Sequence, residues 1–182
     1  MADVLNRTTK TLLRSVNTPD YPVAQWIVGP DLSAVTGVPA EEWIIEGDAV
    51  RAMTTAEKDA QLLDVTKKRK FEAVDRRTGE LIAQGFEFPA ASGQFFSLSS
   101  EAQRNIEGLD HSRDFPELAY PVSWNTLDDL GMLSIADSAT AHSFFLAALS
   151  TYRGHLDSGT ALKDQVRAAT TIAAVDAVTD GR

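Results

Sequence analysis

Cysteine is absent from this chain of 182 residues, and histidine is scarce, with three residues in all. Without cysteine the protein can form no disulfide, offers no thiolate nucleophile and holds no zinc through sulfur. His111, His142 and His155 stand in no spacing typical of a metal site, such as H-x-x-x-H. Because a catalytic histidine also needs a placed partner, we interpret all three as structural or surface residues.

Long apolar runs are lacking as well. No stretch approaches the roughly 20 apolar residues that are needed to span a bilayer. The first residues show no basic segment leading into an apolar one, as a signal peptide would. The sequence therefore predicts a soluble protein made in the cytoplasm, without membrane insertion.

Familiar catalytic fingerprints are missing too: the chain has no G-x-S-x-G, P-loop or dinucleotide-binding motif. Adjacent carboxylates occur at Glu41–Glu42 and Asp128–Asp129. Neighbours point to opposite faces of a strand, and aspartates before Leu130-Gly131 are typical of a turn. We therefore predict no catalytic, cofactor-binding or metal-binding residue and no enzyme; the enzymatic alternative is a small hydrolase that uses unrecognised carboxylates.

Acidic residues outnumber basic ones, which gives a net charge of −9. A diffuse negative surface repels phosphates, so we predict no nucleic-acid partner. The only basic run is Lys67–Lys70, which we interpret as the cationic end of a helix, where positive charge complements the helix dipole. A hydrophobic share of 43% is enough for a packed core, so we expect a folded chain.

The first part of the chain, residues 1–53, is rich in proline and turns. Residues 25–28 are typical of a short strand that Gly29-Pro30 stops. Residues 42–45 and 49–53 flank Gly47, which indicates a hairpin whose turn uses positive φ.

Such short strands supply little core of their own, because isolated hairpins are marginal in water. We therefore expect an extended, strand-rich arm that becomes ordered against another chain. Tyr21, Trp26 and Trp43 are its predicted interface anchors, since large aromatic side chains dominate protein interfaces.

A connector helix is predicted over residues 54–70. Thr54 and Glu57 have the spacing of a capping box, in which each side chain satisfies the other's backbone N–H. The apolar stripe that follows is thin, which is typical of an exposed connector or of a helix at an oligomer seam.

Residues 71–182 alternate strand-like and helix-like patterns. A hairpin of residues 71–75 and 81–88, with a third strand near 95–98, would form a small β-meander. Ser99 should cap a short helix that ends near Gly108, and a further hairpin should join residues 120–124 to 132–135.

Helices are predicted for the C-terminal third. Asp137 should cap a helix that ends at Gly154, and apolar residues recur along it with the spacing of one buried face. We expect a second helix over residues 160–169 and a last short one capped by Thr171. The side chains expected to be buried on the first of these helices are Phe144, Phe145, Leu149 and Tyr152.

The predicted fold class is therefore α+β. It comprises an extended strand-rich N-terminal arm at 1–53, a connector helix at 54–70, and a globular domain at 71–182 with a small β-meander and C-terminal helices.

Four stretches in the first part resemble a segment of phage virion proteins, in which W-x-x-x-G-D-x-V precedes M-x-x-x-E-K. The matching residues here are Ser15–Pro22, Trp26–Val35, Glu42–Asp48 and Met53–Lys58. A second set is similar to a domain that recurs in phage tail-fibre and baseplate-associated proteins. Its residues are Leu81–Gly85, Phe96–Ser99, Ala102, Gln103, Asn105, Tyr120–Trp124 and the span from Leu162 to Thr171.

This resemblance implies a structural component of a tailed bacteriophage particle, at the tail, a tail fibre or the baseplate, that works by protein–protein assembly. Its partners would be other phage structural proteins and further copies of itself, with a trimer as one option by analogy with fibre bases. Its place would be the virion. The alternatives are a tail-fibre assembly chaperone outside the virion and a head or neck decoration protein.

Overall fold

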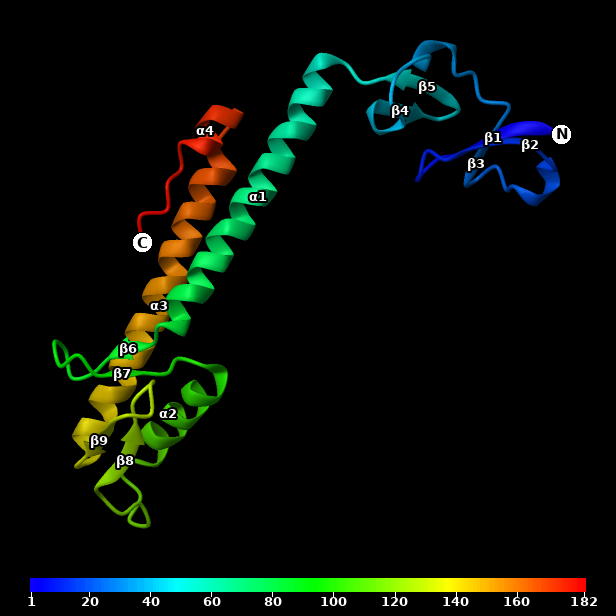
Figure 1. Ribbon diagram of the computed structural model, residues 1–182. Coiled ribbons are helices and arrows are strands. Elements are labelled where there is room, and N and C mark those ends of the chain that lie inside the picture. The colour runs from blue at the N-terminus through cyan, green and yellow to red at the C-terminus, as the bar shows by residue number, and fades with distance from the viewer. The chain divides into compact units, whose positions relative to one another are not determined.

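The computed structural model describes residues 1–182, except for the side chain of Pro19. The chain divides into two compact units, Met1–Asp64 and Val65–Arg182 (Figure 1). The first is rich in short strands and the second is mostly helical, so the predicted α+β class is confirmed.

The first unit begins with a three-stranded antiparallel sheet. Strand β1 (Ala2–Asn6) lies in the middle, between β2 (Leu12–Val16) and β3 (Trp26–Val28). The Asn6 side chain accepts the backbone N–H groups of Thr8 and Thr9 and so closes the turn that follows β1. Three single 3₁₀ turns also belong to this unit: η1 (Thr18–Asp20), η2 (Ser33–Val35) and η3 (Ala40–Glu42).

A two-stranded hairpin follows, as predicted. Strand β4 (Trp43–Glu46) pairs with β5 (Ala49–Ala52), and Glu46 faces Ala49 across the turn. Gly47 has φ +61°, the left-handed conformation that glycine adopts without a steric penalty.

Residues 1–53 were expected to supply little core of their own, and the structure shows a small one. Leu5, Ile27, Val35 and Val50 are buried together, and half-buried side chains, including Trp43, pack around them. Two positively charged side chains connect the segments around this small core. Arg7 binds the Val23 and Gly47 carbonyls and the Asp48 carboxylate, and Lys10 binds the Glu41 and Trp43 carbonyls.

Helix α1 (Thr55–Ala83) starts where the capping box predicts. The Glu57 carboxylate accepts the Thr54 N–H at 2.8 Å, and the Thr54 hydroxyl accepts the Glu57 N–H at 3.2 Å. The predicted end near Lys70 is wrong, and so is the hairpin expected after it, because residues 71–83 continue the helix. No meander therefore forms in this part of the chain.

The physical reason is a long partner, α3 (Ser138–Ala168), which lies beside α1 from Lys67 to Thr78 (Figure 1). Lys163 of α3 pairs with Asp75, and the Arg167 guanidinium stacks on the Phe71 ring. Asp137 caps α3 as predicted, but the helix does not end at Gly154 and includes the residues expected to form a second helix. Tertiary packing thus overrides the weak helix propensity of its glycines.

The far end of this helix pair carries a compact head, which we call the tip and define as residues 84–137. It contains two small antiparallel pairs, β6 (Phe86–Glu87) with β7 (Phe95–Phe96) and β8 (Val122–Asn125) with β9 (Met132–Ile135). Helix α2 (Ser100–Ser112) lies between the pairs in sequence, with Ser99 as its predicted cap, and ends beyond Gly108.

Phe144 of α3 is the centre of the core in the second unit. Its ring is fully buried and lies 5.0–5.4 Å, centroid to centroid, from four aromatic rings. Ala141 and Ala148 are buried beside it. The predicted helix face is thus confirmed at Phe144, whereas Phe145, Leu149 and Tyr152 are only half-buried. The four rings around Phe144 belong to Phe86, Phe88, Phe96 and Trp124.

The last residues fold back on the helix pair. Helix α4 (Ile172–Asp176) begins at the predicted cap, Thr171. Arg182 then reaches α1 and α3: its guanidinium binds the hydroxyls of Thr78 and Ser158, each at 3.1 Å, and the Asp180 carboxylate. Gly159 leaves room for this contact, since a Cβ there would lie 2.7 Å from the Thr78 hydroxyl oxygen.

Candidate interaction surface

The three aromatic residues that the sequence nominates as interface anchors lie in the first unit. Tyr21 and Trp26 form an edge-to-face pair with ring centroids 5.0 Å apart, and both are half-exposed. Trp43 packs against the small core of that unit, and its indole N–H donates to the Val38 carbonyl at 2.9 Å. The structure thus brings Tyr21 and Trp26 together and gives Trp43 a role within its own unit.

A larger group of exposed apolar side chains lies on the tip. Four of them follow one another around the loop between β8 and β9 and the adjoining strand β7, and we call these four the apolar patch. Their exposed fractions are 46% for Phe95, 42% for Leu127, 88% for Leu130 and 65% for Met132. Exposed apolar side chains that lie together are typical of interaction sites, whereas scattered ones are common on any protein surface.

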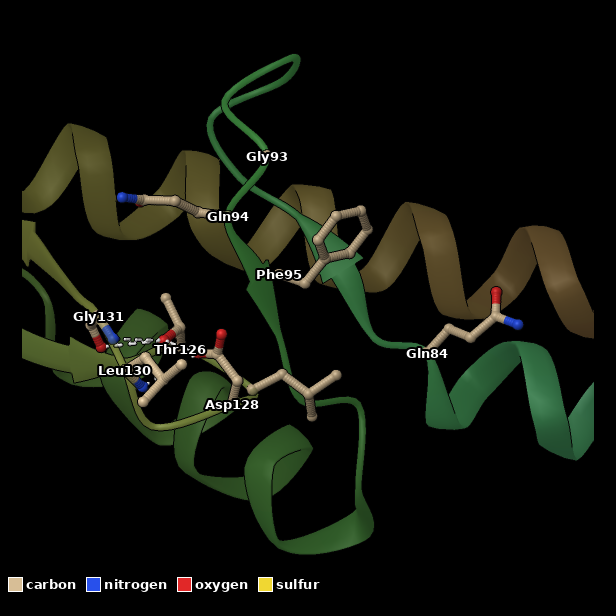
Figure 2. A pocket seen from close by; sticks show the side chains of 9 residues that line it. Gln84, Gly93, Gln94, Phe95, Thr126, Asp128, Leu130 and Gly131 are labelled. Carbon is tan, nitrogen blue, oxygen red and sulfur yellow. Dashed lines mark hydrogen bonds between the residues drawn. The ribbon is translucent and has the colours of Figure 1, made fainter.

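Three of the patch residues line a hollow of about 570 Å³. Figure 2 shows Asp128 and Leu130 on the loop next to β7, and the Phe95 ring projecting from β7 on the side away from that loop. Gln84 and Gln94 lie at its sides and supply amide groups at the rim. The hollow is therefore lined by apolar and polar side chains together, a mixture that is also found in protein contact sites.

The loop from Thr126 to Gly131 is fixed by its own hydrogen bonds. The buried Thr126 hydroxyl lies 2.6 Å from an Asp128 carboxylate oxygen and accepts the Gly131 N–H at 2.9 Å. The same carboxylate accepts the Leu130 N–H. These bonds, with the Thr126 hydroxyl first, lower the pKa of Asp128 from its ordinary value. Asp128 and Asp129 thus serve the turn, as the sequence indicates.

The loop is also tied to the neighbouring strand pair. The Leu127 N–H donates to the Phe95 carbonyl at 2.7 Å, which joins the two halves of the patch. Gly85 makes this approach possible: it has φ +78°, and a Cβ on it would lie 2.1 Å from the Phe96 carbonyl oxygen. The patch is therefore held in place before any partner arrives.

The tip that carries the patch is rich in carboxylates, and Asp128 and Asp129 lie in the patch loop itself. The tip contains nine aspartates and glutamates and two arginines. One of these arginines, Arg113, already pairs with Asp110 and Asp114. The tip as a whole is consequently acidic, and it favours a partner with positive charge.

The other polar groups have structural roles. His142 lies 2.8 Å from the Asp110 carboxylate and joins α3 to α2. Glu42 pairs with Lys58. Within the described part of the chain, no three acidic or histidine side chains gather in a way that could hold a metal ion. Lys67–Lys70 lies inside α1 and not at its end, so the helix-terminus interpretation of this run is wrong.

Sequence reasoning missed the apolar patch. Leu127 and Leu130 fall in a turn, and Phe95 and Met132 fall in short strands, where an apolar residue is ordinarily assigned to the core. The signal that was available is the apolar pair inside the otherwise polar sequence Asn125–Gly131, because apolar residues in an exposed turn are unusual.

Comparisons of the chain with protein-family models, with curated proteins and with solved structures found no match. Among the residues that the structure describes, no helix combines the length and the apolar character that crossing a bilayer requires.

Proposed function

We propose that this protein is a structural component of a tailed bacteriophage particle, at the tail, a tail fibre or the baseplate. It would act by protein–protein assembly and not by catalysis. Two lines support the proposal: the resemblance of both parts of the sequence to phage virion and tail-associated proteins, and the apolar patch on the tip.

The patch is the observation that carries the assembly role. Leu130 and Met132 expose most of their side chains, and burying a large apolar side chain contributes about 1.5–3 kcal/mol. Phe95 adds an aromatic ring, the residue class from which binding hot spots are often built. Because the Thr126–Gly131 loop is already fixed, a partner would lose little free energy in ordering it.

Tyr21 and Trp26 form a second candidate contact, in the first unit. Their paired, half-exposed rings present an apolar body with a polar hydroxyl and N–H. A neighbouring tail protein could bind there while the tip engages another. Trp43, which packs against the core of the same unit, is the third residue proposed for this surface.

Mass spectrometry of purified particles tests the placement. The phage that encodes this chain should carry it in mature virions at a fixed copy number. A chain that is abundant in infected cells but absent from particles would contradict the proposal and would favour the assembly-chaperone alternative.

A Leu130→Asp allele tests the surface. The side chain is exposed, so the variant should fold with an unchanged far-ultraviolet circular dichroism spectrum and melting temperature. It should enter particles at a level at least about tenfold lower, since it places a charge in the middle of an apolar contact. Leu146→Asp, at an exposed apolar position on α3, is the matched control and should enter normally. Normal entry of the Leu130→Asp chain would remove the patch from the proposal.

A further inference from the structure

We propose that two copies of this chain pair in an antiparallel way along their second units. The acidic tip of each copy would lie against the basic stretch of α1 in the other. This inference rests on the proposed function, because it takes the apolar patch to be a protein contact and names its occupant.

The charge of the second unit is divided along its length. Residues 65–83 of α1 carry six lysines and arginines and three carboxylates. The tip, residues 84–137, carries nine carboxylates and two arginines. One chain of net charge −9 therefore presents a positive surface as well as a negative one, and each has the sign that the other needs.

Part of the positive surface is available to bind another chain. Lys68 and Arg69 are exposed, and neither takes part in an ion pair within the described residues. Val65, 38% exposed, precedes them on the same helix and adds apolar area. On the tip, Asp129 is likewise exposed and forms no ion pair in the part of the chain described here, and Met132 is 65% exposed.

The two surfaces lie at opposite ends of the second unit. Lys67 binds the Arg167 carbonyl near the far end of α3, whereas Gln84, just after α1, lines the hollow on the tip (Figure 1). The helical rise places residues 65 and 83 about 27 Å apart. A two-fold axis across this length would bring each tip onto the basic stretch of the other copy, so one operation satisfies both contacts and closes the assembly.

Salt dependence of the purified chain gives the first test. Long-range repulsion between two acidic molecules is already largely screened at 0.1 M salt, where the Debye length is about 10 Å. Further salt then acts mainly on the close charge pairs. Sedimentation velocity should show a dimer at 0.1 M NaCl and a dissociation constant at least about tenfold weaker at 1 M. A monomer at every protein concentration in 0.1 M NaCl would overturn the inference.

Charge reversal then tests the two named surfaces. Lys68→Glu/Arg69→Glu should weaken the dimer about tenfold or more, and so should Asp129→Asn/Met132→Lys. Asparagine tolerates the φ of +57° at position 129. The matched control is Arg14→Glu, an exposed position in the first unit without a described ion pair, and it should dimerise like the unaltered chain.

Mixing the two reversed variants is the decisive experiment. In the mixed dimer, the altered tip faces the altered helix and the two unaltered surfaces face each other, so both contacts regain opposite signs. The mixture should dimerise more tightly than either variant alone. A mixture no tighter than its components would overturn the arrangement, even if both variants fold and both are monomeric.

These outcomes are separate from those of the particle test. A chain that dimerises as described but is absent from virions would leave the pairing intact and remove the phage role. A chain found in virions that stays monomeric would do the reverse.

Discussion

The two units of this chain are stabilised in different ways. The first has a small aliphatic core of Leu5, Ile27, Val35 and Val50. The cationic side chains of Arg7 and Lys10 bind backbone carbonyls around it. The second is built around the buried ring of Phe144, with four aromatic rings in contact with it. Cation-to-carbonyl bonds occur in both units, since Lys67 and Arg77 bind the Arg167 and Arg182 carbonyls in the second. The units therefore differ in their cores, which are small and aliphatic in the first and aromatic in the second.

Phe144→Ala should have the largest effect if this comparison holds. It would leave a cavity inside the aromatic cluster and should lower the free energy of unfolding by about 3–5 kcal/mol. Urea denaturation followed by near-ultraviolet circular dichroism measures this change. Phe145→Ala is the control, and its half-exposed ring should cost clearly less. Equal losses would mean that the packing is not centred on Phe144.

Gly85→Ala tests the close backbone contact that supports the tip. A methyl group there would meet the Phe96 carbonyl oxygen, and φ is +78°, so we expect a loss of roughly 2–4 kcal/mol. Gly79→Ala is the matched control within α1. Its site is open, and alanine in a helix interior should stabilise by about 0.5–1 kcal/mol. A neutral Gly85→Ala variant in thermal unfolding would contradict this account.

Arg7→Ala probes the first unit. The change removes bonds to Val23, Gly47 and Asp48, and partial exposure of the side chain limits the cost to about 1–2 kcal/mol. Hydrogen exchange with mass spectrometry should show faster exchange in residues 1–54 and unchanged exchange around Phe144. Arg14→Ala, which breaks no described contact, should leave both regions unaltered. Uniform loosening of the whole chain would argue against two differently stabilised units.

The smallest expected effect is on the pH dependence of the start of α1. Hydrogen bonds from Arg51 and then Thr54 lower the pKa of Glu57 to about 2, from an unfolded value of 4.5. A carboxyl group whose pKa is lower in the folded state stabilises the fold at pH values above its unfolded pKa. This contribution is lost as the pH falls from about 4.5 toward 2. As the pH is lowered from 6 to 2, the melting temperature of the unaltered chain should fall more steeply than that of Glu57→Gln. Parallel curves would show that this pair is not coupled to folding.

Local signals allowed much of the fold to be predicted. Caps at Thr54, Ser99, Asp137 and Thr171 depend on neighbouring residues only, and all four appear where the sequence places them. The errors arose where the secondary structure depends on contacts between residues that are far apart in the sequence. Gly79 and Gly154 are typical of helix ends, but both lie within long helices. A Cβ at either position would have no neighbouring atom within 4 Å.

The candidate surface shows the same limit. The turn at Asp128–Asp129 follows from local chemistry and was predictable. The exposure of Leu130 and Met132 was not, because burial depends on tertiary packing and not on neighbours in the sequence. The contacts of Trp43 within its own unit were not predictable either, since no local pattern reveals that its N–H donates to the Val38 carbonyl.

The fixed loop also bears on how such a surface could change over generations. Thr126, Asp128 and Gly131 hold the loop through their own side chains and backbone, so its shape does not depend on the Leu130 side chain. Position 130 can therefore vary with little effect on stability while it alters what the tip recognises. A chain of this kind could follow a changing partner by replacing one residue, with the turn that presents it left intact.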